Sequence, residues 1–229
     1  QIEETLASMW KRACNIGTSE KQSEPFLVRL RYQSSDESWG HAVVCYGAEE
    51  GFFSYTVKND NTYSFTKRLL IADPNKKEET YIYISDDNRF AIYSAYPEVN
   101  AFGQREATLD ELRNVTHWDV DVTTIILNIG SSDKVRVTAN GGNAVVQNGH
   151  ILSTDGLDIS VNLRDIGAGN SAGSSAYSYI LRGDADRVTL STVDDDKLNA
   201  DIQIGKYSVS VDGTLDSLTA GKNGTVNIE

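Results

Sequence analysis

Apolar and polar residues alternate with a period of two through most of this chain, and that pattern predicts that strands dominate the structure. Clusters of valine, isoleucine and tyrosine carry the alternation from about residue 26 to residue 96, and again after residue 118. The first residues differ, because their apolar side chains recur with the period of a helix, at Ile2, Leu6, Met9, Trp10 and Ala13. We therefore expect one amphipathic helix at the start of a chain that is otherwise rich in strands.

The composition changes near residue 118. All three prolines and all six phenylalanines precede that position, whereas thirteen of the 18 glycines follow it. Such a change predicts two domains, at residues 1–117 and 118–229. Short strands separated by Gly, Asn and Asp predict that the second domain is all-β, either a sandwich or a short solenoid.

Charge and cysteine content exclude several functions. The formal net charge of −12 argues against a nucleic-acid partner and against an anionic membrane surface. No apolar run is long enough for a transmembrane helix, so we expect no membrane insertion. Two cysteines in 229 residues exclude a disulfide scaffold and a thiolate zinc cluster within the chain. We expect no cofactor and no metal.

The most informative pair of residues is His41 and Asp73. His41 opens the apolar stretch that continues to Tyr46, and Asp73 ends a second apolar run, 69–72. If these two strands pair antiparallel, the start of the first lies beside the end of the second, and the two side chains meet. A carboxylate that accepts from one imidazole nitrogen fixes the tautomer and leaves the other nitrogen as a base. A surface histidine and a turn aspartate are the competing interpretation.

The order of these segments resembles the His/Asn half of papain-like cysteine peptidases. The matching segments are His41-Ala42-Val43, Tyr46-Gly47, Leu69-Leu70-Ile71-Ala72-Asp73 and Tyr81-Ile82-Tyr83-Ile84. The Asp-Pro pair that follows the second strand resembles the bacterial branch, which includes peptidases that trim bacteriocin leaders. The resemblance implies an α+β fold for residues 1–117, with an antiparallel papain-like sheet and few helices. It also implies that His41 is the general base and Asp73 its orienting residue, with Asn75 as the substitute.

The resemblance lacks a nucleophile. Cys14 lies at the end of the first helix, where the helix dipole opposes thiolate formation, and only 26 residues separate it from His41. Cys45 lies on the same strand as His41, about 13 Å along it, which is beyond hydrogen-bond reach. We therefore expect the nucleophilic cysteine on an upstream segment or on a separate chain of the same precursor, and this chain alone to be inactive.

Taken together, the sequence predicts the fragment of a secreted or cell-surface bacterial cysteine peptidase that hydrolyses peptide bonds in a peptide or protein substrate. The alternative is a non-catalytic cell-surface binding or adhesion module that retains a peptidase-like fold. Residues 118–229 contain one histidine and no cysteine, so we expect this domain to serve adhesion, targeting or substrate capture.

Overall fold

A computed structural model of the chain describes residues 1–16, 24–58, 61–108, 110–112, 124–130, 134–162, 177–194 and 197–229. The protein is mostly β: of the residues that the structure describes, 61% lie in strands and 9% in helices, and the sheets are antiparallel. The expected α+β papain-like fold is therefore wrong. The physical reason is that the helical period of apolar residues is confined to the first residues, whereas the apolar segments from residue 26 to residue 106 pair with one another as strands.

The chain divides into two compact units. The first comprises Gln1–Asp121 with Leu163–Asp165, and the second comprises Val122–Asn162 with Ile166–Glu229. The sequence placed the division between residues 117 and 118, a position that lies outside the described residues. Each unit is described by itself below.

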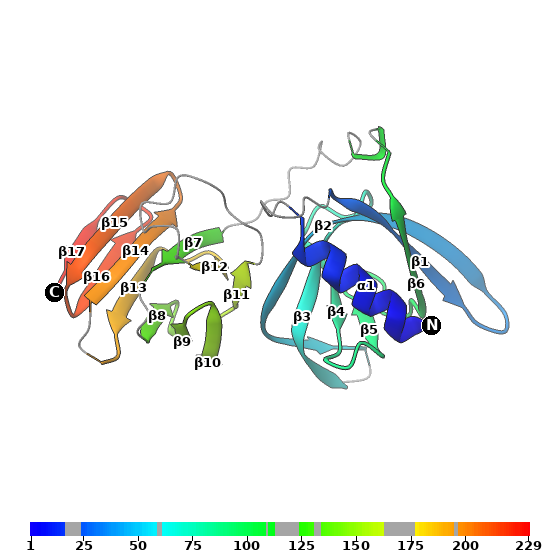
Figure 1. Ribbon diagram of the computed structural model, residues 1–229, viewed down its shortest axis with the longest axis horizontal. Helices are drawn as coiled ribbons and strands as arrows, with labels where there is room; N and C mark the ends of the chain where they lie inside the picture. Colours follow the sequence, from blue (N-terminus) through cyan, green and yellow to red (C-terminus); the bar gives the residue numbers. More distant parts are fainter. Residues whose placement is uncertain are drawn as a thin grey trace. The chain divides into compact units, whose positions relative to one another are not determined.

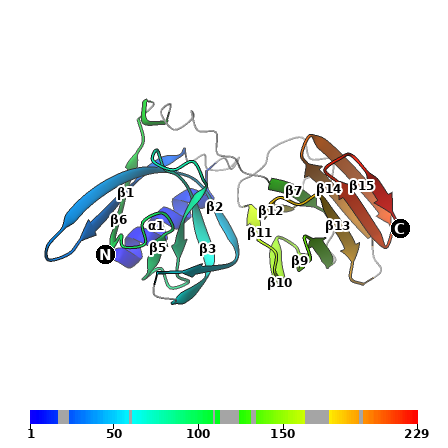
Figure 2. The ribbon, with the colours of Figure 1, turned by 180° about the vertical axis from the view of Figure 1, so that it is seen from behind.

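The first unit combines one helix with an antiparallel sheet. The elements are α1 (Ile2–Cys14), β1 (Phe26–Gln33), β2 (Ser38–Thr56), β3 (Thr62–Ala72), β4 (Thr80–Ile84), β5 (Ala91–Tyr93) and β6 (Ala101–Glu106). Neighbouring strands in the order β6-β1-β2-β3-β4-β5 are all antiparallel. Helix α1 lies across one face of this sheet (Figure 1), and Figure 2 shows the same unit from behind, with strands in front of the helix.

The predicted helix is confirmed by α1. Leu6, Met9 and Ala13 are buried on its inner face, where they join the core formed by one face of the sheet. Acidic residues in its first turn and basic residues in its last turn complement the helix dipole.

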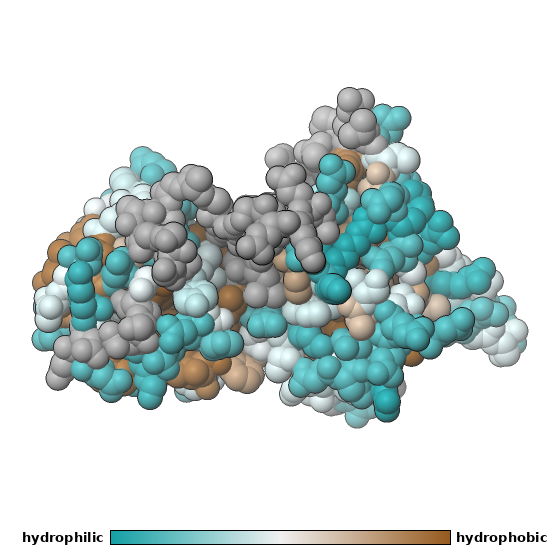
Figure 3. All heavy atoms as spheres, viewed as in Figure 1, coloured by the Kyte–Doolittle hydropathy of each residue, from teal (hydrophilic) through white to brown (hydrophobic). Residues whose placement is uncertain are grey.

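The outer surface of the unit is mostly hydrophilic in the view of Figure 3. None of the helices in the described ranges is both long and apolar enough to cross a membrane.

Strands β2 and β3 form one long hairpin. The sequence pattern predicts shorter strands at 42–46 and 51–57 before a turn at residues 59–61, and at 63–65 and 68–72 after it. Asn59 and Asp60 of this turn lie outside the described residues. In the structure each pair merges into one strand, and two register shifts accommodate the irregular stretches. Val44 is paired with Ala72 and Cys45 with Ile71, so the predicted antiparallel pairing is confirmed. This register brings Asp73, the residue that follows β3, to the part of β2 that contains His41; β2 itself begins earlier than the sequence predicted, at Ser38.

The second unit consists of two antiparallel sheets, a sandwich-like arrangement. Its elements are β7 (Thr124–Ile129), β8 (Val135–Ala139), β9 (Gly142–Gln147), β10 (His150–Asp155), β11 (Ile159–Asn162), β12 (Tyr177–Arg182), β13 (Arg187–Thr192), β14 (Lys197–Ile204), β15 (Tyr207–Thr214), β16 (Ser217–Gly221) and β17 (Val226–Ile228). One sheet has the order β15-β14-β7-β12-β11, and the other has the order β10-β9-β8-β13-β16-β17.

Two asparagine–glycine turns explain how β8, β9 and β10 follow one another. Asn140 and Gly141 have φ of 49° and 79°, and Asn148 and Gly149 have φ of 48° and 77°. Two consecutive residues with positive φ define the type I′ turn, which matches the twist of a hairpin and favours Asn-Gly. The sequence pattern does not predict β10, whose polar residues hide the alternation, and it does not predict β16.

Candidate functional site

The structure brings His41 and Asp73 together. His41 Nε2 lies 2.9 Å from Asp73 Oδ1, within hydrogen-bond distance, as the antiparallel pairing predicted. The Asp73 side chain is fully buried, whereas 16% of the His41 side chain is exposed. The predicted pairing is therefore confirmed as geometry, and the catalytic role of the two residues stays a prediction.

Asp73 accepts hydrogen bonds on both of its carboxylate oxygens. Besides the contact with His41, Oδ1 accepts the backbone N–H of Asn75 at 2.8 Å. Oδ2 accepts the hydroxyl of Tyr93 at 2.5 Å. These donors satisfy a buried carboxylate that would otherwise be costly to place away from water. They also fix its orientation toward the imidazole.

Tyr93 is the site residue that sequence reasoning missed. It is the last residue of β5 and it is fully buried. Its hydroxyl lies 3.3 Å from Thr80 Oγ1 and also donates to Asp73. Burial and the bond to Asp73 raise the pKa of Tyr93 well above its usual range, so it remains a donor. A buried tyrosine needs a partner for its hydroxyl, but the sequence alone does not say that β5 places that hydroxyl beside Asp73.

The geometry assigns different roles to the two imidazole nitrogens. A carboxylate can only accept, so Nε2 of the neutral ring carries the proton that Asp73 binds. Nδ1 then carries the lone pair and is the nitrogen able to take a proton from a nucleophile. The ring also packs edge-on against Tyr96, with centroids 5.8 Å apart, and Trp39 packs edge-on against the same tyrosine. The imidazole is thus held by a hydrogen bond and by aromatic packing.

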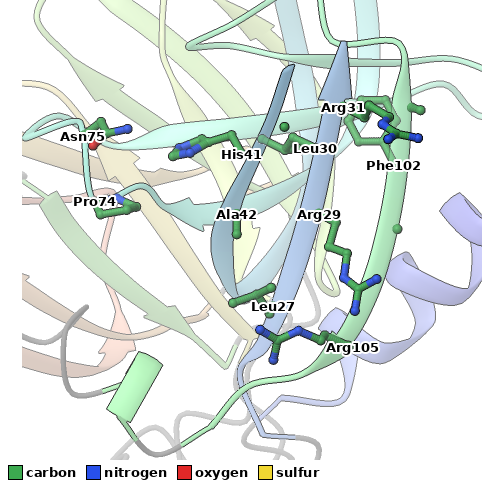
Figure 4. A pocket seen from close by; sticks show the side chains of 13 residues that line it. Leu27, Arg29, Leu30, Arg31, His41, Ala42, Pro74, Asn75, Phe102 and Arg105 are labelled. Carbon is green, nitrogen blue, oxygen red and sulfur yellow. The ribbon is translucent and has the colours of Figure 1, made fainter. Parts of the chain in front are cut away.

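Asn75 does not orient the histidine through its side chain in this arrangement. Its backbone N–H supports the carboxylate of Asp73, which occupies the position beside Nε2. Asn75 instead lines a groove next to His41 (Figure 4). The structure therefore places Asp73, rather than Asn75, in the position of an orienting residue.

Neither cysteine of the chain has the environment of a nucleophile. Cys45 is fully buried in the core, and its thiol contacts the backbone carbonyl of Gly47 at 3.5 Å. Burial raises the pKa of Cys45 to about 12, and burial together with the nearby Glu50 raises the pKa of Cys14 to about 12. A reactive cysteine needs the opposite shift, because the thiolate is the attacking species.

An open groove of about 1010 Å³ adjoins the histidine. It is lined by residues of β1, β2 and β6 and by the two residues after Asp73, namely Leu27, Arg29, Leu30, Arg31, Gly40, His41, Ala42, Pro74, Asn75, Ala101, Phe102, Gly103 and Arg105. In Figure 4, His41 lies at one side of the groove beside Asn75, and Arg29 and Arg105 lie at the other. The groove offers a place for an extended ligand close to the imidazole.

Arg105, which lines this groove, lies beside a capping box formed by Thr108 and Glu111. The carboxylate of Glu111 accepts the backbone N–H of Thr108 at 2.8 Å, and the Thr108 hydroxyl accepts the N–H of Glu111 at 3.2 Å. Glu111 also binds the guanidinium of Arg105 through two hydrogen bonds, of 3.0 and 2.5 Å. The sequence predicts a short helix from this box to about Val115, of which residues 113–115 lie outside the described residues.

Comparison with known proteins does not assign a family. No family model, no curated protein and no solved structure matches this chain. Within the described ranges, no group of three or more His, Cys, Asp or Glu side chains is placed to hold a metal ion. The functional argument therefore depends on the geometry around His41.

Proposed function

We propose that this chain contributes the base of a cysteine peptidase, with His41 as general base and Asp73 as the residue that orients it. The observation that carries the proposal is the 2.9 Å contact between Nε2 and a buried carboxylate, which leaves Nδ1 beside a groove as a proton acceptor. In the reaction, Nδ1 takes the thiol proton as sulfur attacks the peptide carbonyl, and it later returns that proton to the leaving amine.

The proposed nucleophile lies outside these 229 residues, on an upstream segment or a separate chain. This part of the proposal is supported by the two thiols of the chain, whose raised pKa keeps them protonated at neutral pH. A cysteine beside Nδ1 would form the thiolate–imidazolium pair that papain-like peptidases use, whatever fold presents it. The substrate would be a peptide or a protein.

The second unit is proposed to capture or position the substrate outside the cell. It contains one histidine, His150, and no cysteine, so it lacks a cysteine–histidine pair. Its alternating strands and short turns suit a stable surface without disulfide bonds. A secreted or cell-surface location in a bacterium completes this proposal.

Cysteine labelling tests the proposal. The polypeptide encoded by the complete reading frame is treated with limiting iodoacetamide at neutral pH, and the alkylated residue is identified by mass spectrometry. We expect one cysteine outside this chain to react fastest, and His41→Ala to slow that reaction while Cys14→Ser leaves it unchanged. Fastest labelling of Cys14 would contradict the proposal, and the absence of any fast cysteine would favour a non-catalytic binding module.

A further inference from the structure

The groove beside His41 carries positive charge on a chain that is strongly acidic. Along β1, Val28 and Leu30 are buried in the core, whereas Arg29 and Arg31 are exposed. Both arginines line the groove. Because side chains alternate between the two faces of a strand, Arg29 and Arg31 project from the same face, about 7 Å apart along the strand.

These two arginines differ from the others of the first unit. Within the part of that unit that the structure describes, neither Arg29 nor Arg31 has an acidic partner, whereas the remaining arginines each bind a glutamate: Arg12 with Glu106, Arg68 with Glu49, Arg89 with Glu3, and Arg105 with Glu111. The chain as a whole has 33 acidic and 21 basic residues. Two adjacent guanidinium groups without a carboxylate are therefore available to an external anion.

Small residues keep the backbone on both sides of β1 accessible. Gly40 and Ala42 of β2 and Ala101 and Gly103 of β6 line the groove. A Cβ atom added at Gly40 would meet only the carbonyl oxygen of Leu30, at 3.7 Å, and one at Gly103 only the Cβ of Arg29, at 3.9 Å. Because these lining residues are small, the groove beside the two arginines has room for a bound peptide chain.

We propose that this groove binds an extended peptide segment with acidic side chains at alternate positions, so that the peptidase prefers acidic substrates. The inference rests on the proposed function, because it takes the groove beside His41 as the place where substrate lies. Residues two apart on an extended peptide have the same separation as Arg29 and Arg31, so two carboxylates of an acid-x-acid segment meet the two guanidinium groups. Arg29 and Arg31 are then specificity-determining residues.

Peptide binding tests this inference without a nucleophile. Fluorescence anisotropy is measured with this chain and a labelled peptide in which Glu alternates with Ala, and with the matched peptide in which Gln replaces Glu. We expect the Glu peptide to bind about tenfold more tightly, an advantage that falls with added salt. Replacing both groove arginines (Arg29→Gln with Arg31→Gln) should remove most of that advantage, whereas replacing two exposed arginines of the second unit (Arg136→Gln with Arg187→Gln) should not.

The two proposals fail separately. Equal binding of the Glu and Gln peptides, or binding unchanged by the groove substitutions in a chain whose circular dichroism is native, would overturn the inference and leave the role of His41 standing. Tighter binding of a labelled single-stranded oligonucleotide than of the Glu peptide would also overturn it. Conversely, a failed cysteine-labelling experiment would leave the binding of the Glu peptide standing. That binding depends on the groove arginines and needs no nucleophilic cysteine.

Discussion

At the scale of single residues, Asp73 determines which nitrogen of His41 is free. Its carboxylate is held by donors from Asn75 and Tyr93, so the imidazole meets an oriented acceptor. The contact between His41 and Asp73 was predictable because both residues stand at the ends of apolar runs. Tyr93 was not predictable, since no local pattern tells where the hydroxyl of a buried tyrosine finds its acceptor.

Replacing Tyr93 by phenylalanine tests the support of the carboxylate. We expect Tyr93→Phe to lower the free energy of unfolding by about 1–3 kcal/mol, because it removes a donor from a buried carboxylate. Chemical denaturation measures this change. The control is Tyr177→Phe, on a side chain that is 44% exposed, which should be close to neutral. Equal effects at the two positions would show that the Tyr93 hydroxyl does not support Asp73.

The two thiols predict how stability depends on pH. Burial raises the pKa of Cys14 and Cys45 from 9.0 to about 12, so the folded chain holds these protons more tightly than the unfolded chain. Their contribution to stability is therefore fully present below about pH 9 and is lost as pH rises toward 12. A thiol reagent should react slowly with the native chain at pH 8 and should count two thiols per chain in denaturant. Rapid reaction of Cys14, which is only partly buried, would contradict its raised pKa.

At the scale of elements, a buried ion pair joins the central strands of the first unit. Glu49 of β2 and Arg68 of β3 are directly opposite in the register, their side chains are 2.9 Å apart, and both residues are buried. Phe53 and Tyr81 enclose the guanidinium on either side, with ring centroids 4.0 and 4.1 Å from it. This pair lies on the same two strands that lead to His41 and Asp73, beyond the register shift between Cys45 and Gly47.

Breaking this ion pair should destabilise the sheet. We expect Glu49→Gln to lower the free energy of unfolding by about 3–5 kcal/mol, because it removes the charged carboxylate from a buried guanidinium. The neighbouring Glu50→Gln, at a partly buried position, is the control and should cost much less. Denaturant melts of the two variants give the comparison, and a Glu49→Gln variant as stable as the native chain would remove this role for the pair.

The same elements show how far the sequence could predict the fold. The β2–β3 pairing was predictable, since two apolar runs flank a polar turn. The fold class was not, because the resemblance to a peptidase implied an α+β fold, whereas a helical period of apolar residues is confined to the start of the chain. Strand β10 was not predictable because two adjacent apolar residues, Ile151 and Leu152, precede three consecutive polar ones, so no alternation is visible. Pairing with β9 stabilises β10 through backbone hydrogen bonds, and the pattern of its side chains does not predict them.

At the scale of the whole molecule, each unit has buried residues of its own, and tryptophan fluorescence reports on only one of the two units. Trp10, Trp39 and Trp118 all belong to the first. Leu190, in β13 of the second unit, is fully buried, so Leu190→Ala should cost about 2–5 kcal/mol there. We expect this variant to lower the unfolding midpoint measured by circular dichroism but not the midpoint measured by tryptophan fluorescence. Leu69→Ala, in the core of the first unit, should shift the fluorescence midpoint instead. A fluorescence midpoint that follows Leu190→Ala would show that the units unfold as one.

The catalytic role of His41 is tested most directly by the rate of peptide hydrolysis. The polypeptide that joins this chain to the proposed nucleophilic cysteine is compared with its His41→Ala variant on an acidic peptide substrate. The account predicts that kcat/KM falls by at least about 100-fold in His41→Ala, because the thiol loses its base. Cys14→Ser should keep the native rate. A His41→Ala variant that hydrolyses the peptide as fast as the native polypeptide would contradict the account.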